Sequence, residues 1–156
     1  MLVKKIYAIL LLTLISTSGF AKDYKADDIL GFWLAESGSG VIEIYKKGDE
    51  YLGKLVWIKD IHEGKVKEKL DENNPDKDKR SRSLIGLVNL KGFEFKDNEW
   101  SGGEIYDPKK GKTYSAFMKL DGKDTLKLRG YVGVSLFGRT TEWSRQKQAI
   151  PDKYNK

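Results

Sequence analysis

The chain has 156 residues with no cysteine and one histidine, and its 29 basic residues exceed its 23 acidic ones. This composition excludes disulfide bonds, a cysteine nucleophile and a zinc site built from several histidine and cysteine ligands. Acidic and basic residues are mixed along the chain, whereas a nucleic-acid binder gathers basic residues on one face with aromatic residues between them. We therefore expect no cofactor, no bound metal and no nucleic-acid partner.

Residues 1–21 have the three-part pattern of a cleavable signal peptide. Lys4 and Lys5 precede an apolar run over residues 6–15, and Gly19 and Ala21 supply the small residues that a signal peptidase requires. The apolar run is shorter than the roughly 20 residues that cross a bilayer. We expect cleavage after Ala21, a periplasmic or secreted protein, and no membrane span once the signal is removed.

The mature chain has the size of one domain, and its short apolar runs, broken by turn residues, predict an all-β protein. Turn residues separate several runs closely enough for hairpins, namely Lys47-Gly48-Asp49, Asp97-Asn98, 108–111 and Asp121-Gly122. The predicted strands span 31–36, 41–46, 50–58, 87–95, 99–106, 112–120, 124–132 and 136–145.

Eight consecutive antiparallel strands favour closure, because closure removes exposed sheet edges. The sequence therefore predicts a single up-and-down barrel over residues 22–146, with one long loop near 59–86. Residues 147–156 form a basic tail, which we interpret as a solvated end. The interior of so small a barrel is expected to be filled by side chains, and a cavity is a hypothesis.

Alternation assigns side chains to the two faces of the later strands. The interior set comprises Tyr114, Ala116, Met118 and Leu120 in one strand and Leu126, Leu128, Gly130 and Val132 in the next, with Lys127, Arg129 and Tyr131 outside. In the last strand Phe137, Thr141 and Trp143 share a face with Arg139 and Arg145. Either two arginines point inward or this strand contains a bulge, and an inward Arg139 would need a carboxylate such as Glu43 or Glu104, or a bound anion.

The two ends of the domain resemble the lipocalin superfamily. Gly31-Phe32-Trp33 opens the first strand as a Gly-x-Trp motif, and Arg145 closes the last strand. The resemblance implies a lipocalin-like barrel in which Arg145 lies across the Trp33 ring, a cation–π contact that closes the barrel base.

The long loop and several later motifs resemble domain-of-unknown-function family 2147, a family of exported bacterial proteins. The matching stretch runs from Asn74-Pro75-Asp76 through Arg80 and Arg82 to Gly86. Further matching marks are Gly53, Trp57, Ile105-Tyr106-Asp107-Pro108, Gly111, Tyr114, Leu128-Arg129-Gly130-Tyr131, Gly138-Arg139 and Trp143. The resemblance implies the fold and export, and it implies no activity.

The acidic residues of the long loop allow three interpretations. Asp71, Asn73, Asp76 and Asp78 supply oxygen ligands, but their spacing does not fit an EF-hand. Alternatively, the loop is structural, and Asp76 accepts hydrogen bonds from nearby backbone amides or pairs with Arg80 or Arg82. In the third interpretation Arg80 and Arg82 form an anion clamp at the barrel mouth.

Catalysis has few candidate residues. His62, the only histidine, lies in a polar stretch where a surface position is expected. Paired carboxylates hydrolyse glycosides, and the carboxylates available for such a pair are Glu43, Glu104, Asp107 and Glu142.

The sequence therefore favours an exported, noncatalytic binding protein for a small amphipathic or anionic envelope molecule. The candidate ligand-binding residues are Arg80, Arg82, Arg139, Asp76, Tyr106 and Tyr131, with Trp33 and Arg145 closing the barrel. The alternative is a protein-interaction module that acts as an inhibitor or envelope-assembly partner, and the third hypothesis is a carboxylate-dependent hydrolase.

Overall fold

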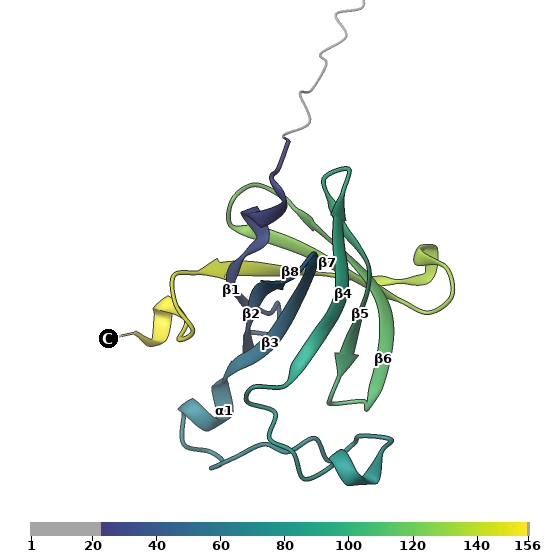
Figure 1. Ribbon diagram of the computed structural model, residues 1–156. Helices are drawn as coiled ribbons and strands as arrows, with labels where there is room; N and C mark the ends of the chain where they lie inside the picture. Colours follow the sequence, from purple (N-terminus) through teal and green to yellow (C-terminus); the bar gives the residue numbers. More distant parts are fainter. Residues whose placement is uncertain (1–22, 156) are drawn as a thin grey trace, which may run out of the picture.

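The computed structural model describes residues 23–155, which form a closed antiparallel barrel of eight strands arranged in chain order (Figure 1). Each strand pairs with the next, and β1 also pairs with β8, which closes the sheet. The predicted eight-stranded, lipocalin-like barrel is confirmed, whereas the predicted signal peptide and its cleavage site lie outside the described residues. The strands are β1 (Gly31–Leu34), β2 (Gly40–Lys47), β3 (Glu50–Ile58), β4 (Val88–Lys96), β5 (Glu99–Asp107), β6 (Lys112–Leu120), β7 (Thr125–Tyr131) and β8 (Arg139–Gln146).

Each predicted hairpin turn connects two strands. The β4–β5 turn places Asp97 and Asn98 at φ values of 51° and 62°, the left-handed conformation that asparagine and aspartate tolerate best after glycine. Gly48 and Gly122 serve the same purpose in the β2–β3 and β6–β7 turns. The short turns fix the register of the neighbouring strands, because they leave no slack for a slip.

One end of the barrel is closed by the segment before β1. The short helix η1 (Ala26–Ile29) lies across this end, and Ile29 is fully buried. Two buried indole groups use its carbonyls: Trp33 Nε1 donates to Ile29 O at 2.8 Å, and Trp100 Nε1 donates to Ala26 O at 3.0 Å. We call this the closed end.

Arg145 completes the closed end as the lipocalin resemblance implies. Its guanidinium lies 4.1 Å from the centre of the Trp33 ring and donates to the carbonyl oxygens of Leu30, Asp28 and Lys123 at 2.8, 2.6 and 2.7 Å. Three hydrogen bonds and one ring contact therefore fix the Arg145 guanidinium between the segment that leads into β1 and the β6–β7 turn.

The interior near the closed end is filled by side chains. Trp33, Trp100, Tyr51 and Phe93 are almost completely buried there. The predicted inward faces of β6 and β7 are confirmed for Ala116, Met118, Leu120, Leu126 and Leu128, which are buried.

The prediction for the last strand is wrong at its start. Phe137 belongs to the short helix η3 (Ser135–Phe137) and is 80% exposed, and Val132, predicted to face the interior, is 72% exposed. The chain leaves the sheet after Tyr131, where Gly133 turns with φ 71°. The β7–β8 pairing is regular, so there is no bulge in it; Arg139 and Arg145 instead lie at opposite ends of the barrel.

The other end of the barrel, which we call the open end, carries the long connection between β3 and β4 (Figure 1). This connection begins with α1 (Lys59–His62), includes the short helix η2 (Lys77–Lys79) and is held together by a Leu70–Ser83 bridge.

The C-terminal segment packs against the barrel and is not the solvated tail that we predicted. Pro151 is buried, and Tyr154 in η4 (Asp152–Tyr154) lies 5.1 Å from the Trp57 ring and 5.2 Å from the His62 ring, measured between ring centres. In residues 23–155, no helix has both the length and the apolar character needed to cross a bilayer.

Candidate ligand-binding site

The half of the barrel interior at the open end contains a cavity of about 500 Å³ that opens to solvent. Its wall is mainly apolar and includes Ile42, Leu55, Ile105, Leu128 and Trp143, which come from five different strands. This volume lies within the range of small-molecule sites, which are lined mostly by apolar side chains with a few polar groups. The hypothesis of an interior cavity therefore holds for one half of the barrel, and side chains fill the other half.

Asn89 lines this cavity and carries a buried polar atom that has no partner among the described residues. The side chain lines the cavity, and its buried Oδ1 atom accepts no hydrogen bond from any residue in 23–155. The β3–β4 register explains its direction: Gly53 pairs with Leu90 while Lys54 pairs with Val88, so Asn89 is an extra residue in a bulge. A buried unpaired acceptor costs about 1–3 kcal/mol, so a donor placed there would be favoured.

Two polar groups of the inner wall pair with each other or with the backbone. Trp143 Nε1 donates to Thr141 Oγ1 at 3.0 Å, and Thr141 Oγ1 donates to the Leu128 carbonyl at 3.4 Å. Both of these donors are therefore satisfied within the wall, whereas Asn89 Oδ1 has no partner in residues 23–155.

Charged side chains surround the cavity mouth. Lys69 forms an ion pair with Asp60 at 2.6 Å, and Arg139 forms one with Glu36 at 3.3 Å. The adjoining Lys109 is exposed and forms no ion pair among the described residues. Lys110, also exposed and without an ion pair there, lies over the Tyr114 ring, with Nζ 6.0 Å from the ring centre. The mouth therefore offers two cations to an anionic group.

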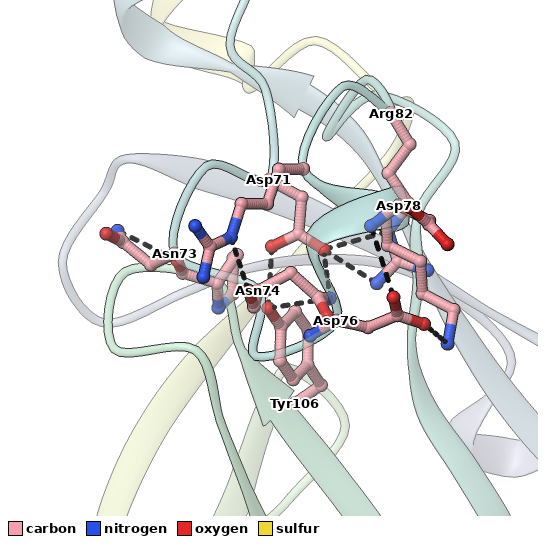
Figure 2. A network of polar contacts seen from close by, with 10 residues as sticks. Asp71, Asn73, Asn74, Asp76, Asp78, Arg82 and Tyr106 are labelled. Carbon is pink, nitrogen blue, oxygen red and sulfur yellow. Dashed lines mark hydrogen bonds and ion pairs between the residues drawn. The ribbon is translucent and has the colours of Figure 1, made fainter.

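The long loop forms part of the cavity wall, and a buried carboxylate holds it in place (Figure 2). Asp71 is fully buried and accepts hydrogen bonds from Tyr106 Oη at 2.6 Å, Asn74 Nδ2 at 2.7 Å and Arg82 Nε at 2.8 Å. The guanidinium of Arg82 also lies 5.8 Å from the centre of the Tyr106 ring. Since Tyr106 is on β5, this network ties the loop to the barrel.

The network shifts two ionisation equilibria. Burial raises the pKa of Asp71, but the hydrogen bonds from Tyr106, Asn74 and Arg82 and the Arg82 charge outweigh burial and hold that pKa below its usual value. Burial, together with the hydrogen bond to Asp71, raises the pKa of Tyr106 to about 12. Asp71 is therefore charged and Tyr106 is protonated across the neutral range.

Gly111 provides a second contact for the loop. Its φ is 62°, and a side-chain Cβ at this position would lie 1.8 Å from the Asn73 carbonyl oxygen. Asn73 Nδ2 also donates to Lys109 O at 3.1 Å. A glycine is needed here both for the turn and for the close approach of the loop backbone.

The sequence of the chain matches a known protein family over most of its length. The family described as "Uncharacterized protein conserved in bacteria (DUF2147)" matches residues 31–145. The chain belongs to this family. The predicted membership is confirmed.

The fold of this DUF2147 protein is similar to that of a solved structure, protein HP1028 from Helicobacter pylori, which is described as belonging to the lipocalin family. The match has a TM-score of 0.66 and 22% sequence identity, and covers 80% of this chain and 84% of that one. At this identity the similarity establishes the fold. No curated protein matches the chain.

The predicted ligand-binding residues separate into three groups in this DUF2147 protein. Tyr106 and Arg139 line the cavity, but Arg139 is at the rim with its side chain 81% exposed, and its partner is Glu36 instead of Glu43 or Glu104. Tyr131 contacts Phe117 on the outer wall, at 6.4 Å between ring centres. The other three predicted residues, Asp76, Arg80 and Arg82, lie in the loop and not in the cavity wall.

Each of the three loop residues interacts with another part of the loop. Arg80 Nε donates to Asn74 O at 2.8 Å, and Asp76 accepts from the Asp78 amide at 3.1 Å, as the structural interpretation predicts. Asp76 also pairs with Lys79 at 2.8 Å, and not with Arg80 or Arg82. The partner of Arg82 is Asp71, which the sequence analysis considered only as a metal ligand.

In residues 23–155, no group of three or more histidine or carboxylate side chains is arranged to hold a metal ion. Glu43 pairs with Lys54 at 2.9 Å, Glu142 lies 3.7 Å from Lys127, and Glu104 is exposed. Of the four carboxylates considered for hydrolysis, Asp107 is the one that borders the cavity.

Asn89 and Lys109 were missed by the sequence analysis. Asn89 interrupts an otherwise apolar run between Val88 and Leu90, which is the signal that a bulge or a polar cavity group leaves in a sequence. Lys109 lies within a predicted turn, where a lysine is ordinary.

Proposed function

We propose that this protein is an exported, noncatalytic binding protein that holds one small amphipathic molecule in the open-end cavity. The supporting observation is an apolar wall that includes Asn89, whose buried Oδ1 atom has no partner in the described part of the chain. The apolar part of the ligand fills the space beside Leu128 and Trp143, and a hydroxyl or N–H group of the ligand donates to Asn89.

An anionic or strongly polar end of the ligand remains at the mouth, near Lys109 and Lys110. These two lysines have no competing carboxylate partner among the described residues, whereas Arg139 and Lys69 each have one. An anion that binds Arg139 or Lys69 would have to break an existing ion pair. The unpaired Lys109 and Lys110 are therefore the better anion contacts.

Binding is tested by titrating the mature protein with single-chain amphiphiles that differ only in the head group, while tryptophan fluorescence is followed. A long-chain alcohol and its methyl ether form the informative pair, because they differ in one hydrogen-bond donor. We expect saturable binding of the alcohol, about tenfold tighter than that of the ether, which corresponds to roughly 1.4 kcal/mol for the Asn89 contact.

Two variants locate the site. Asn89→Leu removes the acceptor at similar volume and should abolish the preference for the alcohol while the fold persists. Ile105→Trp adds bulk inside the cavity and should weaken both ligands, whereas Phe117→Trp adds the same bulk on the outer wall and should leave binding unchanged. Absence of saturable binding across all head groups, or equal binding by Ile105→Trp, would refute the proposal.

A further inference from the structure

The connection between β7 and β8 (residues 132–138, here called the apolar loop) exposes large apolar side chains. Val132 is 72% exposed, Val134 57%, Leu136 78% and Phe137 80%. Loops are usually polar because they face water, and contiguous exposed apolar groups mark interaction sites. The apolar loop projects outward from the barrel wall, away from the rest of the chain (Figure 1).

The exposed side chains are held by an ordered backbone. Arg129 on β7 donates through Nε to Ser135 O at 2.7 Å and through a terminal nitrogen to Leu136 O at 3.1 Å. Its other terminal nitrogen donates to Thr140 Oγ1 at 2.9 Å, on the β8 side of the loop. A guanidinium with three such bonds fixes the backbone of the loop. Leu136 and Phe137 are therefore held in exposed positions by an ordered backbone.

Unpaired positive charge lies at the same end of the barrel. The β5–β6 hairpin carries Lys109, Lys110 and Lys112, all exposed, and none of them forms an ion pair among residues 23–155. Tyr131 pairs with Ser115 on β6, so the apolar loop leaves the sheet beside the start of β6, close to this hairpin.

We propose that the apolar loop docks the open end of the barrel onto an anionic phospholipid surface. Leu136 and Phe137 enter the boundary between head groups and acyl chains, and the lysines of the β5–β6 hairpin contact the anionic head groups. A protruding loop needs a complementary groove on a protein partner, whereas a lipid surface accepts it without one. The charge of the hairpin also matches anionic lipid.

This docking does not depend on a ligand in the cavity, although it would turn the cavity mouth toward the lipid. The experiment uses the mature protein and two kinds of vesicle, phosphatidylcholine alone and phosphatidylcholine mixed with phosphatidylglycerol. We expect cosedimentation with the mixed vesicles that weakens as salt is added, and much weaker binding to phosphatidylcholine alone.

Paired variants separate the apolar and the electrostatic contributions. Leu136→Ser with Phe137→Ser should lower the partition coefficient at least tenfold, whereas Ile85→Ser, at a 41% exposed apolar residue in the long loop, should change it less than twofold. Changing Lys109, Lys110 and Lys112 to glutamine should weaken binding more than the same change at three lysines of the closed end. These are Lys47 and Lys96, the last residues of β2 and β4, and Lys123 in the β6–β7 turn.

A Phe137→Trp variant reports the contact directly. Its added fluorescence should shift to shorter wavelength on mixed vesicles and be quenched by lipids brominated on their acyl chains. Absence of vesicle binding, or unchanged binding by the doubly substituted loop, would overturn the proposal. A loop-dependent dimer in sedimentation without vesicle binding would also overturn it, and would identify the apolar loop as a contact between copies of the chain.

Discussion

The two ends of the barrel differ in whether every buried polar group discussed above has a partner. At the closed end, the indole nitrogens of Trp33 and Trp100 and the guanidinium of Arg145 all have carbonyl partners. At the open end, Asn89 Oδ1 is buried without a partner beside a cavity of about 500 Å³. Stability is thus concentrated at one end, while the other end keeps the unsatisfied group and unfilled space that a ligand would use.

The two ends also differ in whether the barrel can survive their loss. The closed end joins the first and last strands, so its loss opens the sheet. The long loop of the open end is attached through Asp71 and Gly111, and its loss leaves every strand pair in place. Changes at the closed end should therefore unfold the barrel, and changes at the open end should release the loop.

The largest effect is expected for Trp33→Ala. The ring is fully buried and carries both a hydrogen bond and the Arg145 contact, so the free energy of unfolding should fall by about 3–5 kcal/mol. Urea denaturation followed by circular dichroism measures this loss, and a loss below about 1 kcal/mol would show that the closed end does not hold the barrel.

Arg145→Ala is the second single variant of a double-mutant cycle with Trp33→Ala. It should lower the free energy of unfolding by about 1–2 kcal/mol. Because the guanidinium stacks on the ring at 4.1 Å, the two losses should be less than additive in the double variant. Additive losses would mean that the contact contributes no free energy.

An effect between those of Trp33→Ala and Arg145→Ala is expected for Gly111→Ala, about 2–4 kcal/mol, from the left-handed backbone and from the collision with Asn73. Gly122→Ala is the matched control, because Gly122 has a φ of 83° but no atom within 4 Å of its Cβ position, so it should lose about 1–2 kcal/mol. Hydrogen exchange should show opening of residues 59–86 in Gly111→Ala alone. Equal exchange in both variants would contradict loop attachment through Gly111.

An effect as small as that of Arg145→Ala is expected for Tyr106→Phe, about 1–2 kcal/mol at neutral pH, since Asp71 keeps its other donors. The pKa of Tyr106 rises from 10 to about 12 on folding, so the contribution of this bond is complete below pH 10 and is lost as pH rises through about 12. Tyrosinate absorbance should contain one titration near pH 12 that is missing in the variant. Identical titration curves would contradict the bond.

The contribution of Asp71 to the stability of the loop has the opposite pH dependence and is lost in acid. Its folded pKa lies below the ordinary value of 3.8, so its contribution is present above that pH and is lost as pH falls through the folded value. We expect the loop to be released in strong acid before the barrel unfolds, because the closed-end contacts of Trp33 and Trp100 involve no carboxylate.

Local patterns were sufficient for the barrel itself. The alternation of Ala116, Met118 and Leu120, and of Leu126 and Leu128, predicted their burial correctly, because a strand turns successive side chains to opposite faces. Turn residues such as Asp97-Asn98 marked the hairpins, because few residues accept a left-handed backbone. The contact between Trp33 and Arg145 followed from a family resemblance and required no knowledge of the packing.

Tertiary structure alone decided which partners meet across long separations. Four features depend on strand register and on loops far apart in sequence: Arg82 pairs with Asp71, Asn89 lines the cavity, the long loop contacts Gly111, and Phe137 is exposed. Alternation predicts a side chain's face only within a regular strand, so it fails at a bulge or beyond a strand end. The barrel could therefore be read from the sequence, whereas the cavity and the loops around it required the fold.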